Sequence, residues 1–446
     1  MKRDAQRRRR PPLTMMAVLG AAALILAACS SSPSTPSSAK GLPGETDGVT
    51  STSITIGATT PETGPAAPGY DEIAPAANAY FKYTNAHGKV NGRTIKYLIE
   101  NDQYDPAITA TLTRQLVLQD HIFADVGPLG TPTFLQVKSF LNTEGVPALF
   151  VESGCNCWSS PSLPITFGWQ PPYTDEGKVL GRYIDGHFAG QKVGYLSQDD
   201  EFGQDGVKGL DDQIPSSDVV GRQTYVATTQ GLASGLGSQI DALKAAGAKV
   251  VVLYTIPAAT ALALLAAAEV GYNPQWVVSS VGSDPPTLTG LLSSISKGAA
   301  GASLLSGIIS DAYLPPITDA TNSWIVGFKK ILHTYDSGAP WDGNTEYGLA
   351  LGYNVVQDLK AAGKNLTRTA LVDAVENHSS SLPGPWLVPL SYTKSDHYGI
   401  QGNEVVQLEN GGQTIKTLTP VEATTISGPI TTPTSTPSVA PSGFGS

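Results

Sequence analysis

The sequence predicts an α/β protein with two lobes, each built on a doubly wound parallel sheet. β-rich segments alternate with helix-length segments along the body of the chain, and strands separated by such helices form parallel sheets covered on both faces. The alternation stops at GWQPPY, residues 168–173, and then restarts. The body, residues 51–421, is also too long for a single hydrophobic core.

The first series of elements begins with SITIGATT, residues 53–60, whose alternation and β-rich composition predict a strand. In the next segment Ile73, Ala77, Tyr80 and Thr84 fall on one helical stripe. The remaining elements of this series are strands at 93–102, 122–130 and 146–151 and helices at 108–120 and 133–145.

The second series follows the same rhythm. Its helix at 257–271 begins with a proline, which is tolerated in the first turn, and ends on a glycine. The other expected elements are helices at 177–190, 202–214 and 234–246 and strands at 192–197, 218–226, 248–254 and 276–280. In open sheets of this kind ligands bind beyond the carboxyl ends of the strands, and two lobes can bring those ends together across a cleft.

The N-terminus has the pattern of an export signal. Six basic residues lie within the first ten, and the apolar run at 13–28 carries no charge. Sixteen residues fall short of the ~20 that a membrane-spanning helix needs. The run ends in LAAC, residues 26–29, which resembles the lipobox of bacterial lipoproteins. That resemblance implies a signal peptide at 1–28 and lipidation of Cys29, and an uncleaved membrane anchor is the alternative. Both put the rest of the chain outside the cytoplasm.

Low-complexity segments flank the body. Residues 29–51 are rich in Ser, Pro and Gly and predict a lipid-anchored tether. Residues 422–446 have a similar Thr/Ser/Pro character and are predicted to be disordered. The formal net charge is −10. We expect no nucleic-acid partner, because phosphates would repel an acidic protein.

The segment VESGCNCWSS, residues 151–160, contains two of the three cysteines. Zinc normally needs four ligands, and Cys155 and Cys157 have no histidine nearby. Thiols outside the cytoplasm tend to oxidise, and a lipidated Cys29 would leave the other two only each other as partners within the chain. We expect a local disulfide between Cys155 and Cys157, with two free thiols or a metal or redox site as alternatives.

The sequence contains no enzymatic signature. The nucleophile elbow, the phosphate loop, the dinucleotide fingerprint and the H-E-x-x-H zinc motif are all missing. The six histidines are scattered, with no two at metal-ligand spacing. The acidic turn Asp199, Asp200 and Glu201 suits helix capping or solvation better than acid–base chemistry. We therefore predict a protein that is not an enzyme and needs no metal or cofactor.

Six stretches carry a family resemblance. They are ITIGATTPETGPAAPGY at 54–70, NAHGKVNGRTIKYLIENDQYDP at 85–106, FADVGPLGTPT at 123–133, VPALFVESG at 146–154, KVGYLSQDDEFGQDGVKGL at 192–210, and the segment from AKVVVLY to WVVSS at 248–280. In this order they resemble the substrate-binding proteins of branched-chain amino acid type ABC transporters, the type I periplasmic binding proteins. Each motif is weak alone, but their shared order is specific. The resemblance covers about residues 53–419.

The family's fold implies two lobes joined by a three-strand hinge. We expect the crossings near 169–173, 307–314 and 386–392. Lobe 1 would comprise 52–170 and 314–388, and lobe 2 would comprise 171–313 and 389–421. Ligand contacts made by both lobes favour the closed form, which a permease can read.

The resemblance also implies which residues meet the ligand. The turn that holds an amino acid's carboxylate and ammonium falls on 130–133, which makes Thr131 and Thr133 candidates, with helix capping as the alternative. The second ligand loop falls on Glu152, Ser153 and Gly154. The further candidates are Tyr173 in the first crossing and Phe202, Tyr254, Thr255 and Ser280 in the second lobe.

One departure from the family pattern concerns the ligand's charge. In amino acid binders an acid on the second lobe commonly pairs with the ammonium, whereas the matching region here, SSVGS at 279–283, has none. This difference argues against an ordinary leucine-type ligand. Glu152 could supply the charge from the opposite lobe, and a structural hydrogen-bonding role is the alternative.

Together these features predict a monomeric lipoprotein at the outer face of the bacterial cytoplasmic membrane. By hinge closure it would capture a small polar ligand, an amino acid, an amide or a related carboxylic acid, and deliver it to the permease subunits of an ABC transporter. The alternative is a sensory lipoprotein that reports its ligand to a signalling partner without transport.

Overall fold

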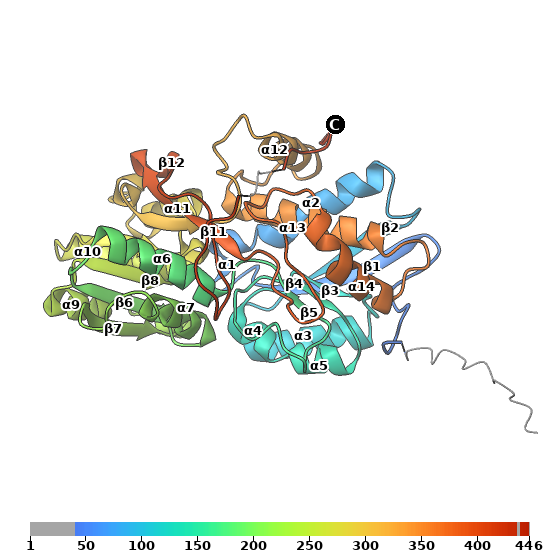
Figure 1. Ribbon diagram of the computed structural model, residues 1–446, viewed down its shortest axis with the longest axis horizontal. Coiled ribbons are helices and arrows are strands. Elements are labelled where there is room, and N and C mark those ends of the chain that lie inside the picture. The colour runs from blue at the N-terminus through green and yellow to red at the C-terminus, as the bar shows by residue number, and fades with distance from the viewer. Residues whose placement is uncertain (1–40, 435–437, 446) are drawn as a thin grey trace, which may run out of the picture. The chain divides into compact units, whose positions relative to one another are not determined.

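Two parallel β-sheets organise the chain in a computed structural model, which describes residues 41–434 and 438–445 (Figure 1). The predicted signal peptide, Cys29 and the first part of the predicted tether lie outside the described residues. None of the helices in the described part combines the length and the apolar character that crossing a bilayer requires.

The first sheet has the strand order β2-β1-β3-β4-β5, with all neighbours parallel. Ile54 and Leu149 pack in one apolar cluster while Ala148 and Val151 pack in another, so both faces of the sheet are covered. Helices α2 and α13 lie over one face and α3, α4 and α5 over the other (Figure 1). The elements are β1 (Ser53–Thr60), α2 (Ile73–Ala86), β2 (Thr94–Asn101), α3 (Pro106–Leu118), β3 (Asp125–Val126), α4 (Thr131–Leu135), α5 (Lys138–Thr143), β4 (Ala148–Val151), β5 (Thr166–Gly168) and α13 (Gly343–Ala361).

The second sheet has the order β12-β11-β10-β9-β8-β6-β7, and β13 pairs with β11. Val250 and Val252 face the α6 and α7 side, while Val251 and Leu253 face the opposite cluster, as the two-residue period of a strand requires. Only the pairings of β11 are antiparallel. The elements are α6 (Tyr173–His187), β6 (Val193–Gln198), α7 (Glu201–Asp211), β7 (Val219–Tyr225), α9 (Gly237–Ala246), β8 (Val250–Tyr254), α10 (Pro257–Glu269), β9 (Gln275–Val278), α11 (Pro285–Ile295), β10 (Ile309–Ala312), β11 (Gly402–Glu409), β12 (Thr414–Thr417) and β13 (Glu422–Ala423). The structure therefore has the two predicted α/β lobes with parallel sheets.

The chain passes between the lobes three times. The first passage follows β5, and the second leads from β10 to α12 (Ser323–Tyr335), which packs with α2 and α13 in lobe 1, where α13 also packs with α14 (Arg368–His378). The third lies later than the predicted boundary at residue 389. The hydroxyl of Tyr392 donates to the carbonyl of Gly168 over 2.6 Å, and the ring of His397 stacks on Phe167. These contacts keep residues 391–400 beside lobe 1, so lobe 2 resumes only at β11.

The described part of the predicted tether is folded against lobe 1. The guanidinium of Arg368, which is 2% exposed, donates to the carbonyls of Pro43, Ile122 and Phe123. The backbone N–H of Thr369 donates to the carboxylate of Glu45 over 3.1 Å. Residues 41–51 are thus part of the lobe, because partners more than 300 residues away supply the contacts that their own composition lacks.

The C-terminal segment also differs from the predicted disorder. Within its described residues, β13 pairs with β11, and the ring of Phe444 packs 4.9 Å from Trp324 and 5.2 Å from Phe328. The indole N–H of Trp324 donates to the carbonyl of Ser438 over 2.9 Å. The contacts of Ser438 and Phe444 with Trp324 therefore hold the described end of this segment against α12.

Candidate functional site

A cleft of about 190 Å³ lies between the lobes, at the carboxyl ends of the parallel strands. Residues that directly follow β3, β4 and β5 line it from lobe 1, including Leu129, Glu152 and Gln170. Ser280 after β9 and Tyr313 after β10 line it from lobe 2. This is the position at which open α/β sheets bind ligands.

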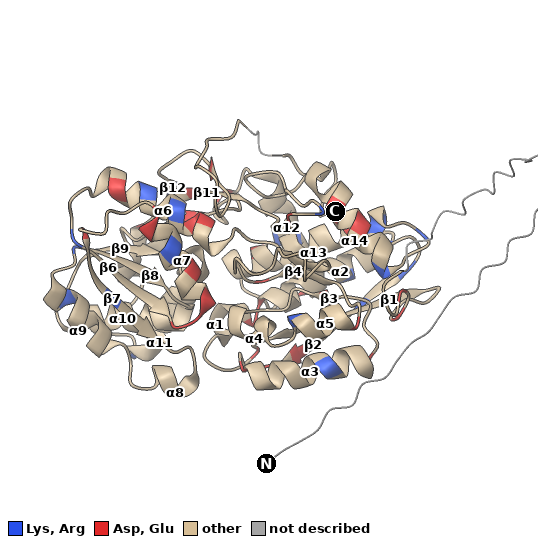
Figure 2. Cartoon of the chain, turned by 60° about the horizontal axis from the view of Figure 1, so that its bottom comes forward, with Lys and Arg blue, Asp and Glu red and all other residues tan. Residues whose placement is uncertain are grey.

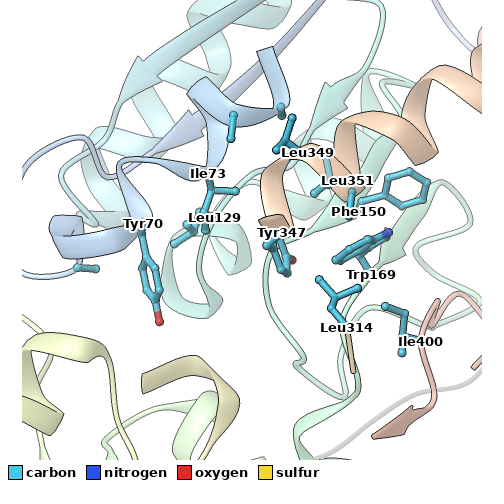
Figure 3. Close-up of a cluster of buried hydrophobic side chains, with 14 of the residues drawn as sticks. Tyr70, Ile73, Leu129, Phe150, Trp169, Leu314, Tyr347, Leu349, Leu351 and Ile400 are labelled. Atoms are coloured by element: carbon cyan, nitrogen blue, oxygen red, sulfur yellow. The ribbon is translucent and has the colours of Figure 1, made fainter. Parts of the chain in front are cut away.

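Aromatic rings form much of the cleft wall. The Tyr173 and Phe202 rings lie 4.6 Å apart between centroids, and those of Tyr313 and Tyr347 lie 6.5 Å apart. Tyr347 also packs edge-on against Trp169 at 4.7 Å (Figure 3). The aromatic residues that line the cleft are Tyr70, Tyr104, Tyr173, Phe202, Tyr313 and Tyr347.

Carboxylates provide the charge of the cleft. Its charged lining residues within the described part of the chain are Glu152, Asp284, Asp311 and Glu346, and no lysine, arginine or histidine is among them. Elsewhere in the fold both acidic and basic residues occur along the helices (Figure 2). Glu152 is 8% exposed and Glu346 is 3% exposed. Burial raises the pKa of both carboxyls well above the ordinary value, and Asp284 adds to the effect at Glu346.

One carboxylate oxygen of Glu152 and one of Glu346 also lack a hydrogen-bond partner. Among the described residues, no group pairs with Oε2 of Glu152 or with Oε1 of Glu346. Buried polar atoms are normally hydrogen-bonded, so each such atom needs an explanation. Here both atoms belong to residues that line the cleft.

A second pair of acids anchors the loop after β9. The backbone N–H of Ser280 donates to Oδ1 of Asp311 over 2.9 Å and to Oε1 of Glu176 over 2.8 Å. The Ser280 hydroxyl also donates to Glu176 over 2.7 Å, and Asn403 donates to Oδ2 of Asp311 over 2.9 Å. Burial first, and then the charge of Glu176, raises the pKa of Asp311 well above the ordinary value. Lobe 2 therefore does present acids at the cleft, Asp311 from β10 and Asp284 from just beyond the SSVGS segment.

Asp284 has a different role, because both of its oxygens are used. Oδ1 accepts from the backbone N–H of Gly343 at the start of α13, over 2.9 Å, and Oδ2 accepts from Thr287. Burial first, and then Asp342, raises the pKa of Asp284 to about 6. This carboxyl joins lobe 2 to a helix of lobe 1 at the edge of the cleft.

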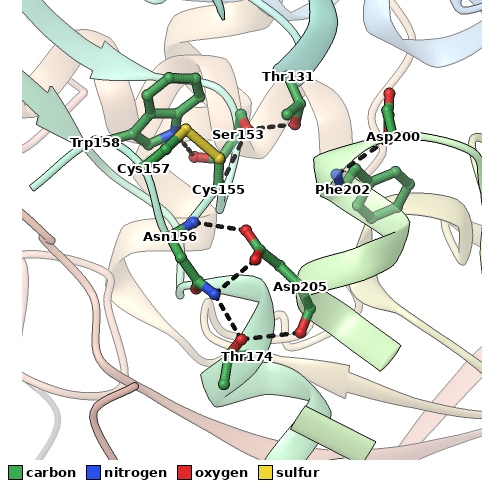
Figure 4. Close-up of a disulfide and its surroundings, with 10 residues drawn as sticks. All are labelled: Thr131, Ser153, Cys155, Asn156, Cys157, Trp158, Thr174, Asp200, Phe202 and Asp205. Carbon is green, nitrogen blue, oxygen red and sulfur yellow. Dashed lines mark hydrogen bonds between the residues drawn. A yellow bond between two sulfur atoms is a disulfide. The ribbon is translucent and has the colours of Figure 1, made fainter. Parts of the chain in front are cut away.

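The cysteine loop lies behind the cleft wall (Figure 4). Cys155 and Cys157 are joined by a disulfide. Between them, the backbone N–H of Asn156 donates to Oδ2 of Asp205 over 2.8 Å, and its amide Nδ2 donates to Oδ1 over 2.7 Å. Because Asp205 lies on α7 of lobe 2, the loop links the two lobes.

The predicted site residues divide into two groups. Thr131, Glu152, Tyr173, Phe202 and Ser280 line the cleft, whereas the other five do not. The Thr133 hydroxyl donates to the carbonyl of Leu129 over 2.5 Å, and the Thr255 and Thr260 hydroxyls pair over 2.6 Å. Residues 153–154 support the wall from behind, and Tyr254 packs on Phe202 at 5.8 Å.

Several lining residues were missed in the sequence. Tyr70 ends the first ligand loop and could have been included on that basis. Glu346 is the only charged residue between 343 and 357, and an isolated acid in a long uncharged stretch of a helix is a usable signal. Asp311 lies in the short strand β10 and Tyr313 directly follows it, and the place of this strand in the sheet is set by pairing with the distant β11. Tyr104, Asp284 and Tyr347 were also missed.

Comparison with known proteins agrees with the fold. A family model described as periplasmic binding protein matches residues 53–413. No curated protein matches the chain. A substrate-binding periplasmic protein from Ralstonia solanacearum has 18% identity and a TM-score of 0.73, over 82% of this chain and 100% of that one.

Two other solved structures show the same fold with different ligands in their descriptions. A branched chain amino acid ABC transporter protein from Thermus thermophilus with bound valine has 18% identity and a TM-score of 0.72, over 84% of this chain and 97% of that one. A fatty acid ABC transporter substrate-binding protein from Thermomonospora curvata has 19% identity and a TM-score of 0.73, over 88% and 96%. With two α/β lobes around a cleft at the strand ends and a family match over most of its length, the chain belongs to the periplasmic binding protein family, in its type I fold.

Proposed function

We propose that this protein is an extracytoplasmic solute receptor that captures a small polar molecule by closing its two lobes and delivers it to an ABC permease. The observation that carries the proposal is the enclosed cleft, to which both lobes contribute polar groups. A receptor of this kind binds and releases its ligand unchanged, so we propose no enzymatic activity. The candidate ligands are an amino acid, an amide or a related carboxylic acid.

Contacts between the lobes support the hinge-closure mechanism. The hydroxyl of Tyr70 in lobe 1 donates to the carbonyl of Val281 in lobe 2 over 2.6 Å. The side-chain amide of Gln198 in lobe 2 donates to the Tyr104 hydroxyl in lobe 1 over 3.2 Å. Both tyrosines line the cleft. A ligand that touches the same walls would add to these contacts and shift the population towards the closed form.

The test combines binding with a measurement of shape. The purified protein is screened by thermal shift against amino acids, amides, amines and carboxylic acids, and each hit is examined by small-angle scattering. A ligand present at 100 times its Kd should add about 2.7 kcal/mol of stability. We expect at least one compound to raise Tm and to reduce the radius of gyration. Binding without compaction would contradict closure, and chemical conversion of the compound would contradict a receptor.

Membrane attachment through Cys29 is a separate prediction. Two or more acyl chains hold a protein firmly, because each buried methylene contributes about 0.8 kcal/mol. In a bacterial host, the unchanged chain should fractionate with membranes and Cys29→Ala should not be lipidated. Mass spectrometry of the N-terminal peptide reports the modification directly. An unmodified Cys29 in the membrane fraction would instead favour an uncleaved anchor.

A further inference from the structure

We propose that the cleft binds an organic cation, an amine, amidine or quaternary ammonium that carries no free carboxylate. This inference rests on the proposed receptor function and assigns a cation as its ligand, in place of the amino acid, amide or carboxylic acid that the sequence predicts. Three independent features of the cleft support it: unpartnered carboxylates, an aromatic wall and a lining without basic side chains.

The first feature is the pair Glu152 and Glu346. Both line the cleft, both are more than nine-tenths buried, and one oxygen of each has no hydrogen-bond partner among the described residues. A buried carboxylate is costly unless it is paired. The N–H groups of an organic cation that enters the cleft would supply the missing hydrogen bonds, and a quaternary ammonium would supply the opposite charge alone.

The second feature is the composition of the wall. Five tyrosines and one phenylalanine line the cleft. Aromatic faces attract cations through the ring quadrupole, and quaternary ammonium groups are commonly held in such cages. Aromatic rings beside carboxylates suit an organic cation with an apolar body. A bare metal ion fits less well, since no described cluster of three acidic, histidine or cysteine residues could hold one.

The third feature is the lack of a place for a ligand carboxylate. Four acids and no described lysine, arginine or histidine line the cleft. The hydroxyls of Thr131 and Ser153 pair with each other over 2.7 Å, and the Ser153 hydroxyl also accepts the backbone N–H of Cys155. Thr133 is occupied by the carbonyl of Leu129. A free acid would therefore meet like charges at close range with little to offset them.

The same acids predict a proton exchange on binding. Tyr97, Tyr313 and Tyr347 face Glu152, and Asp284 faces Glu346. None of these groups is cationic, and burial raises the pKa of both glutamates, whereas the charge of a bound cation would lower it again. A permanent cation should displace protons when it binds, whereas a neutral or anionic ligand should not.

The experiment compares three compounds with one carbon skeleton. These are 3-methylbutylamine, leucine and 4-methylpentanoate, which carry an ammonium, both charges and a carboxylate respectively. Choline, putrescine, agmatine and 2-phenylethylamine extend the range of cation sizes. We expect calorimetry to show binding of at least one cation. The affinity for every cation that binds should be at least tenfold higher than the affinity for its matched amino acid or acid. Choline binding should release protons. Because the buffer takes up these protons, the measured binding heat should differ between phosphate and Tris buffers.

Substitutions then connect the affinity to the two glutamates. Glu152→Gln and Glu346→Gln keep the side-chain shape and remove the charge, and each should weaken cation binding at least tenfold. Glu404→Gln is the matched control, since Glu404 is also 8% exposed but does not line the cleft. It should leave the affinity unchanged. The Tm of each ligand-free variant verifies that it is folded.

Three results would overturn the assignment of a cation. They are binding of leucine or 4-methylpentanoate as tight as that of the amine, cation binding that survives both glutamine substitutions, and hits confined to neutral compounds. In all three the receptor function still stands, because a ligand binds and compacts the protein. If no compound of any charge bound to the protein or made it more compact, both the cation assignment and the receptor function would be contradicted.

Discussion

At the scale of single residues, the cleft contains side chains that are expensive to bury. Glu152 follows β4, where its backbone pairs in a short bridge with Leu129. Its carboxyl lies against Gly127, whose position would place a side-chain carbon within 2.7 Å of Oε1 and whose φ is +67°. Only glycine fits both this backbone conformation and this approach. The packing that admits Glu152 therefore costs stability, which is a common sign of a functional residue.

This cost leads to a prediction about the ligand-free protein. At pH 8 the free energy of unfolding of Glu152→Gln, measured by urea denaturation, should exceed that of the parent by about 1–3 kcal/mol. The reason is that a neutral amide replaces a buried acid without a partner. The same substitution should weaken ligand binding. A loss of stability comparable with that of an ordinary core substitution would show that Glu152 has a structural role instead.

At the scale of elements, the disulfide loop acts as a link between the lobes. Asn156 makes two hydrogen bonds to the Asp205 carboxylate and a third to the hydroxyl of Thr174, over 2.7 Å. Hydrogen bonds to charged groups contribute about 1.5–3 kcal/mol each. Because Asp205 belongs to the opposite lobe, this energy is available only when the lobes are closed.

The link predicts a change in affinity without a change in fold. Asn156→Ala should weaken binding of whichever ligand is identified about fivefold or more, since about 1.4 kcal/mol lost from the closed state is tenfold in Kd. The ligand-free Tm should change little. Ser160→Ala is the control, because Ser160 lies in the same loop and bonds only within it, to Ser162. Equal affinities for the two variants would show that the loop does not stabilise closure.

The elements also show what local sequence can predict. The alternation of strand and helix is visible because each element carries a local signal. A buried strand such as Val250–Tyr254 is a short apolar run, and an amphipathic helix has an apolar stripe. The segments that were mispredicted depend on distant partners: Pro43 on Arg368, Tyr392 on Gly168 and Phe444 on Trp324. No local pattern encodes such contacts, so the tether, the third crossing and the tail could not be placed in advance.

The same reasoning explains the mixed outcome at the cleft. Residues directly after the early strands, such as Thr131 and Glu152, could be placed from the strand order and the family resemblance. Asp311 and Glu346 line the cleft too, the first from β10 in lobe 2 and the second from α13 after the chain has passed back to lobe 1. The position of Asp311 depends on the pairing of β10 with β9 and with the later strand β11, and that of Glu346 depends on the second passage between the lobes, so no local motif encodes either.

At the scale of the whole molecule, buried acids without cationic partners should set the pH dependence of stability. Burial raises the pKa of Asp358 to about 7. Burial, with Asp102 adding to it, raises the pKa of Asp125 to about 8, and both oxygens of Asp125 lack partners among the described residues. An aspartate in an unfolded chain has a pKa of about 3.9. Between these values the folded state holds protons that the unfolded state has lost.

The sign of the effect follows from this difference in bound protons. Stability falls with rising pH wherever the folded state binds more protons, by up to about 1.4 kcal/mol per pH unit for each group. The contribution of each raised pKa is complete below about pH 4 and is lost as pH rises towards its folded value. We therefore expect urea denaturation at pH 5, 6, 7 and 8 to give steadily lower free energies of unfolding. In Asp125→Asn the free energy of unfolding should fall less steeply between pH 6 and 8, by up to about 1.4 kcal/mol per pH unit, because one of the groups that binds a proton in the folded state has been removed. Stability that is constant or rises across this range would contradict the raised pKa values of these acids.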